Sequence, residues 1–289
     1  MTTSEKVKAY YSLTKPGVLY GNAITAVAGF LFAAKGHISW ILFISAINGI
    51  TLVIASACVI NNYFDQDIDK IMVRTKKRAI VAGLVPAKRA AIFGIVLGII
   101  GLLILAAHTS WLVVALALLG FFDYVFLYGM WSKRKSMHGT LVGSVSGAVP
   151  ILVGYCAAAH TFNLGAFLVF AVLFVWQMPE FYSIAIYRQK EYKAAGVPVI
   201  TVVKGVGYTK KQILAYTIAF VIFSLSLACA GAGLTYFVVM AFIDAYWIWL
   251  GIKGLHARDN DKWARKMFHF SLNALMAFSI LISLNAWLP

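Results

Sequence analysis

Charged residues, and acidic ones above all, are what this chain of 289 residues has least of. Only 12% of its residues are charged, whereas 62% are hydrophobic, which excludes an ordinary soluble domain. Ten acidic residues stand against 25 lysines and arginines, so the formal net charge is +15. Because the basic residues are scattered among short segments rather than gathered on one domain, we expect no nucleic-acid partner.

Cysteine is also scarce. Cys58, Cys156 and Cys229 all lie in apolar segments and show neither a CxxC motif nor a Cys/His spacing. These three positions therefore predict neither a disulfide framework nor a zinc site. We expect all three to be small buried hydrophobic residues.

Long apolar runs, by contrast, recur along the whole chain, and each is long enough to cross a bilayer. Nine spans can be drawn, at 17–34, 40–61, 89–107, 111–130, 140–159, 163–184, 213–230, 234–252 and 268–288. With a cytoplasmic N-terminus, 24 of the 25 lysines and arginines fall on inner segments, leaving only Lys35 outside. The predicted fold class is an all-α membrane protein. It has nine transmembrane helices in one bundle, a single domain over 1–289 and a cytoplasmic tail at 1–14.

Residues 61–83 combine acidic and basic side chains where the second span ends. If the helix continues, Asn61, Asp65 and Asp69 share one face at spacings i, i+4 and i+8. Carboxylate and amide oxygens suit Mg²⁺, which proteins usually hold together with substrate phosphates. Arg74 and Arg78 follow, and guanidinium groups grip phosphate esters well. The pattern indicates a diphosphate site.

The same residues carry a resemblance to a known family. The spacing reads Asn61-x3-Asp65-x2-Ile68-Asp69-x2-Met72-x-Arg74-Thr75-x2-Arg78-x4-Gly83. It resembles the signature of the UbiA superfamily of intramembrane prenyltransferases. Segments 13–22, 139–157 and 195–205 are more similar to the haem O synthase branch than to the quinone-precursor branches.

This resemblance implies an activity and a location. The enzyme would transfer a farnesyl group from farnesyl diphosphate to a vinyl group of haem B, giving haem O, with Mg²⁺ as cofactor. It would be a multi-pass protein of the bacterial inner membrane with its active site facing the cytoplasm. Haem A synthase or the assembly of a terminal oxidase would be its possible partners.

A second acidic motif lies about half the chain from the first in members of the family. Here Glu180 and Glu191 are 11 residues apart, and Arg188 falls on the same helical side as Glu180. The resemblance implies that Asp65, Asp69 and Glu191 are catalytic. It also implies that Glu191 binds a second magnesium ion. For Glu180 three interpretations stay open, a metal ligand, a contact to the haem or a partner of Arg188, because the resemblance to the haem branch implies a His at this position.

Further polar residues complete the predicted site. The resemblance implies that Tyr128, Lys133 and Arg134 contact the diphosphate, with Arg74, Arg78 and Arg188, although an interfacial anchor explains them equally well. His138 and His269 are candidate haem ligands at the cytoplasmic end.

Two other functions remain as alternatives. A prenyltransferase acting on 4-hydroxybenzoate or a naphthoate would use the same diphosphate site. A cation-coupled transporter would instead depend on Asp123 and Asp244, single acidic residues at similar depth within their spans. These two carboxyl groups could share a proton or bond to nearby hydroxyl groups.

Overall fold

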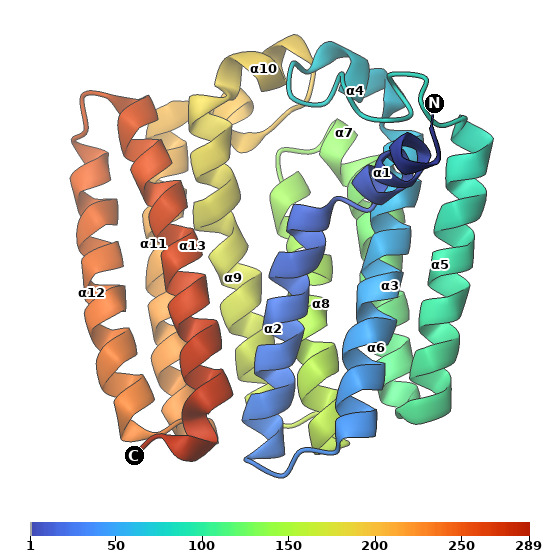
Figure 1. Ribbon diagram of the computed structural model, residues 1–289. Coiled ribbons are helices and arrows are strands. Elements are labelled where there is room, and N and C mark those ends of the chain that lie inside the picture. Colours follow the sequence, from blue (N-terminus) through green and yellow to red (C-terminus); the bar gives the residue numbers. More distant parts are fainter. Residues whose placement is uncertain (1) are drawn as a thin grey trace.

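The computed structural model describes residues 2–289, and every regular element in them is helical (Figure 1). The long elements are α2 (Pro16–Ala34), α3 (Trp40–Phe64), α5 (Ala87–His108), α6 (Trp111–Phe122), α8 (Gly139–Ala159), α9 (Leu164–Tyr187), α11 (Ile200–Ser226), α12 (Leu234–Leu255) and α13 (Asn260–Leu284). The short ones are α1 (Thr3–Leu13), α4 (Gln66–Ile71), η1 (Asp123–Ser132), α7 (Lys133–Lys135), α10 (Gln189–Ala194), η2 (Leu227–Ala230) and η3 (Asn285–Trp287).

Nine helical segments within residues 2–289 are long and apolar enough to cross a membrane, which confirms the predicted number. The short elements α1, α4, α7 and α10 gather at one end of the bundle, which we call the polar end (Figure 1). The chain enters at this end and finishes at the opposite one. The predicted tail at 1–14 is thus largely a helix, whose N-terminus carries a capping box of Thr2 and Glu5.

Glycines let the central helices approach one another closely. A Cβ atom on Gly154 of α8 would lie 1.9 Å from the carbonyl oxygen of Ala26 on α2. A Cβ on Gly29 of α2 would lie 2.1 Å from the carbonyl oxygen of Ile151 on α8. Such backbone contact is typical of packed membrane helices, where small residues replace the hydrophobic driving force. Gly98 of α5 likewise packs against Ser56 of α3.

Two spans begin earlier than the hydropathy pattern predicts. Helix α11 starts at Ile200 rather than at 213, with a break at Gly205, where φ is 79°. Helix α13 starts at Asn260 rather than at 268. The first turns of both helices carry lysines or arginines that lower the local hydropathy, although their backbone is already helical.

The expectation for the cysteines was partly wrong. Cys58 and Cys156 are buried in the helix bundle, as predicted. Cys229, in η2 at the end opposite the polar end, is exposed instead. An apolar neighbourhood in the sequence does not show whether a side chain faces the bundle or the lipid.

Candidate active site

A cavity of about 500 Å³ opens at the polar end and continues between the helices. Its polar mouth is lined by residues of the 61–83 segment, by Lys133 and by Tyr192. Its deeper wall is apolar and aromatic, formed by side chains such as Ile50 on α3, Trp176 on α9 and Leu275 on α13. The cavity therefore suits a molecule with a charged head and a long apolar tail.

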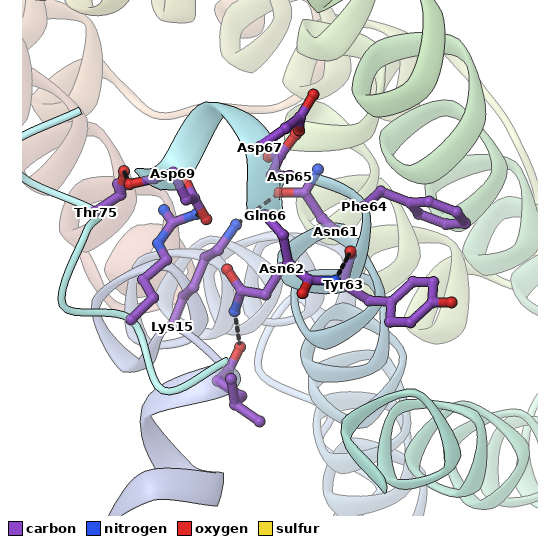
Figure 2. A network of polar contacts seen from close by, with 12 residues as sticks. Lys15, Asn61, Asn62, Tyr63, Phe64, Asp65, Gln66, Asp67, Asp69 and Thr75 are labelled. Carbon is purple, nitrogen blue, oxygen red and sulfur yellow. Dashed lines mark hydrogen bonds and ion pairs between the residues drawn. The ribbon is translucent and has the colours of Figure 1, made fainter. Parts of the chain in front are cut away.

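Asn61, Asp65 and Asp69 lie together on the cavity wall, as the spacing predicts. Helix α3 ends at Phe64, but the amide of Asp65 donates to Asn61 and that of Asp69 donates to Asp65, so the helical register continues. All three side chains are buried. In Figure 2, Asp67 points away from this group, and its side chain is 64% exposed.

Two cations already neutralise these carboxylates. Lys133 Nζ lies 2.5 Å from Asp65 Oδ2, and Arg78 Nη1 lies 2.6 Å from Asp69 Oδ2. Arg74 also lines the cavity, and no acidic partner for it is found within residues 2–289. Three of the predicted diphosphate-binding cations are therefore at the mouth of the cavity.

The side chain of Lys133 reaches the cavity because of the unusual helix before it. Residues Asp123–Ser132 form a π-helix, whose hydrogen bonds run from i to i+5. Its turns are wider than those of an α-helix, so spacings of four and five residues both return to one face. Tyr124, Tyr128 and Lys133 consequently all line the cavity. Periodicity analysis at 3.6 residues per turn could not predict this alignment.

Arg134 has a different position from the one predicted. Its guanidinium group lies 2.6 and 2.8 Å from the two oxygens of Asp67 and also donates to the carbonyl of Phe64. It lies 3.6 Å from Asp65 Oδ1 but does not line the cavity. These hydrogen bonds lower the pKa of Asp67 to about 2. Arg134 thus holds the start of α4 in place from outside the cavity.

Lys15 is a cavity residue that the sequence pattern did not single out as part of the site. It lies directly before α2, and its ammonium group donates to Asn61 Oδ1 at 2.8 Å (Figure 2). It also donates to the Tyr124 hydroxyl at 3.3 Å. Burial lowers the pKa of Lys15 to about 8. Its backbone is in the left-handed region, with φ 54°, which is uncommon for a lysine. The Lys-Pro pair at the start of an apolar span was the available signal.

The second acidic region is divided between two places. Glu180 lines the cavity on α9, across from the first acidic group. Glu191 does not line it and is bound instead by Arg188 at 3.0 Å. The alternative in which Arg188 pairs with Glu180 is therefore wrong. Glu191 Oε2 is nevertheless buried without a hydrogen-bond partner, so a polar group could still be bound there.

The remaining candidates lie outside the cavity. His138 and His269 are exposed at the polar end and do not line it. Asp123 accepts a hydrogen bond from the backbone amide of Ser146 on α8, whereas Asp244 is buried on α12, on the far side of the bundle (Figure 1). The two acids accordingly do not share a proton.

The side chains present fit a magnesium ion. Asn61, Asp65 and Asp69 form a group that we call the acidic column. Within it, Asp65 Oδ1 is buried without a hydrogen-bond partner. The Asn61 amide nitrogen is also buried without a partner, so its side chain is held in place only through its oxygen. A hard divalent cation takes such oxygens as ligands and leaves positions for phosphate oxygens. Asn61, Asp65 and Asp69 are the residues that would hold it.

The site thus combines carboxylates, nearby lysines and arginines, and a deep apolar cavity inside a helix bundle. This combination is typical of membrane-embedded enzymes that bind diphosphates with apolar tails. Comparison with known proteins agrees: the model of the UbiA prenyltransferase family matches residues 22–273, and the chain belongs to that family. It is similar to proteins named protoheme IX farnesyltransferase from Photorhabdus laumondii and Yersinia pseudotuberculosis. Each is 45% identical, with 98% and 96% of this chain and 97% and 95% of the relative covered.

Solved structures share the fold. A digeranylgeranylglyceryl phosphate synthase is similar with a TM-score of 0.83 and 19% identity, covering 98% of this chain and 99% of the other. A UbiA homolog from Archaeoglobus fulgidus, solved with DMAPP and Mg²⁺, has a TM-score of 0.69 and 15% identity, covering 95% and 99%. At these identities the likeness establishes the fold alone.

Proposed function

We propose that this protein is a magnesium-dependent farnesyltransferase that acts on protohaem, the activity after which the 45% identical relatives are named. The observation that supports it best is the buried group of Asn61, Asp65 and Asp69 at the mouth of an apolar cavity. Farnesyl diphosphate matches that combination because its head is highly charged and its tail is a hydrocarbon. We further propose that the polar end faces the cytoplasm of a bacterium, since most basic residues lie there.

Each group at the mouth has a distinct task in the reaction. When bound, Mg²⁺ would neutralise the diphosphate and so make it a better leaving group. Arg74, Arg78 and Lys133 bind the remaining phosphate oxygens, and their positive charges stabilise the negative charge that develops as the C–O bond breaks. Lys15, from the other side of the column, adds a fourth cation.

The apolar part of the cavity controls what happens to the allylic cation. Tyr124, Tyr128, Trp176 and Phe181 line the cavity, and the faces of aromatic rings attract cations. The helices around these rings exclude bulk water, so the farnesyl cation persists long enough for the vinyl group of the acceptor to attack it. One water molecule must then add to the resulting cation and lose a proton to give the hydroxyethylfarnesyl group.

Glu180 lines the cavity without a cationic partner among residues 2–289. A carboxyl group there can orient the acceptor or the water through a hydrogen bond. We therefore assign Glu180 to the acceptor side of the cavity and the Asp65 group to the diphosphate side.

The direct test uses the purified protein in lipid nanodiscs with protohaem, farnesyl diphosphate and Mg²⁺. We expect haem O to form, and we expect Asp65→Asn to reduce the rate at least about a hundredfold while the protein remains folded. A matched control is Asp259→Asn, an exposed acidic residue that caps α13 far from the cavity. Prenylation of 4-hydroxybenzoate with no haem O formed would assign the protein to the quinone-precursor branch instead.

A further inference from the structure

A cluster of basic and aromatic side chains lies at the polar end, where α9 ends and α13 begins (Figure 1). We call it the Tyr187 cluster. It consists of Tyr187, Arg188, Arg265, Phe268 and His269. The Arg265 guanidinium carbon lies 4.5 Å from the centre of the Tyr187 ring, and that of Arg188 lies 5.7 Å from it. Two cations therefore lie against the same aromatic ring.

The charge of this cluster is not used by the diphosphate site. Neither arginine lines the cavity mouth beside Asp65 and Asp69. Arg188 is shared with Glu191, but Arg265 has no acidic partner among residues 2–289 and is exposed. An exposed arginine held against a ring, without an acidic partner, is well prepared to bind an incoming carboxylate.

The cluster is continuous with the wall of the cavity. Glu180 on α9 lines the cavity, and Tyr187 follows it seven residues later, two turns further along the same helix face. Leu272 on α13 also lines it and comes three residues after His269, which places the two on neighbouring turns of one helix face. Helices α9 and α13 pack against each other along this wall. A flat molecule held by the cluster would therefore extend along α9 and α13 toward the cavity.

We propose that the Tyr187 cluster binds the carboxylate edge of the acceptor, so that Arg265 and Arg188 hold the two propionates of the haem. This inference rests on the proposed function. The vinyl groups lie on the opposite edge of the macrocycle, so anchoring the propionates directs a vinyl group into the cavity, toward the farnesyl carbon. The ring of Phe268, which packs against Tyr187, offers apolar surface to the porphyrin.

An anionic phospholipid carries charge that the same two arginines could bind. The porphyrin is favoured because the cluster joins the reaction cavity and because two cations gathered at one ring match two carboxylates on one rigid macrocycle. The decisive probe is the dimethyl ester of protohaem, which keeps the macrocycle and the vinyl groups but lacks both negative charges.

The experiment compares the wild type with Arg265→Gln at saturating farnesyl diphosphate, using protohaem and its dimethyl ester as acceptors. We expect the substitution to raise KM for protohaem about tenfold, the loss expected for one charge-assisted hydrogen bond, and to leave kcat and KM for the ester unchanged. Arg265→Lys should restore part of the difference. Arg258→Gln, an exposed arginine between α12 and α13, is the matched control and should change nothing.

Three results would overturn the inference. They are equal changes with both acceptors, no change with either, or weaker binding to phosphatidylglycerol vesicles with an unaltered KM for protohaem. A wild type that makes no haem O would contradict the proposed function instead. In that event a spectroscopic titration with protohaem still tests the cluster, because Arg265→Gln must weaken its binding.

Discussion

At the scale of single residues, Lys15 supplies a positive charge that faces the acidic column from the opposite side. Its ammonium group is held by the Asn61 side chain and the Tyr124 hydroxyl. Burial makes that charge costly, and it would be compensated by a nearby diphosphate. In the proposed reaction, Lys15, which directly precedes α2, would therefore bind the diphosphate leaving group.

Replacing Lys15 by Met tests this role because it keeps the length of the side chain and removes its charge. We expect KM for farnesyl diphosphate to rise about tenfold or more, since a charge-assisted hydrogen bond is lost, while the KM for protohaem stays the same. Initial-rate kinetics with each substrate varied in turn measures both. Lys8→Met, on the exposed side of α1, is the control. An unchanged KM for farnesyl diphosphate would show that Lys15 only positions Asn61.

The position of a side chain in the site was predictable where sequence spacing alone determined it. The column of Asn61, Asp65 and Asp69 follows from a period that the backbone keeps through the end of α3. The positions of Arg134 and Glu191 did not follow, because each is decided by a partner that folding brings near, Asp67 in one case and Arg188 in the other. A lysine or arginine close to an acidic motif in the sequence can bind the ligand, or it can form an ion pair with a carboxylate of the protein.

At the scale of secondary-structure elements, the site depends on how closely α2 and α8 pack. Gly154 and Gly29 bring the two backbones into contact. Both helices contribute to the cavity wall, α2 through residues such as Asn22 and α8 through residues such as Ser146. The sequence predicted the spans but not which helices meet, since nearly every segment contains small residues.

Replacing Gly154 by Ala should separate these helices, because the added Cβ would overlap the carbonyl of Ala26. Overpacking of this kind costs about 1–3 kcal/mol, so we expect a lower apparent melting temperature in nanodiscs. Gly207→Ala on α11 is the matched control: a Cβ there meets nothing within 4 Å, and alanine favours helix. Equal melting temperatures for both variants would argue against a tight α2–α8 contact.

At the scale of the whole molecule, the nine spans found within residues 2–289 form a bundle, and the charged groups of its cavity lie almost entirely at one end. This separation follows from the solvent: polar side chains remain near the aqueous boundary, and the apolar tail of a substrate extends among the helices. Hydropathy and charge were enough to predict the number of spans. The π-helical segment and the break at Gly205 were not predictable, because both are backbone adjustments that tertiary packing selects.

Removing divalent metal tests the assembled site rather than any one ligand. We expect EDTA to abolish prenyl transfer and added Mg²⁺ to restore it, because without the metal no ion would bridge the diphosphate to the carboxylates of Asp65 and Asp69. EDTA already saturated with Mg²⁺ is the control for effects on the membrane. Undiminished turnover in metal-free buffer would contradict the assignment of these residues as metal ligands.

The ion pairs between Lys133 and Asp65 and between Arg78 and Asp69 also affect how a reaction cycle ends. Each lysine or arginine has two competing partners, a carboxylate of the protein and an oxygen of the substrate. In the proposed reaction, Asp65 and Asp69 would pair with Lys133 and Arg78 again once inorganic diphosphate has left, and this exchange would oppose rebinding of the product. The two carboxylates would thus compete with inorganic diphosphate for the same cations, which would leave the cavity free for the next farnesyl diphosphate.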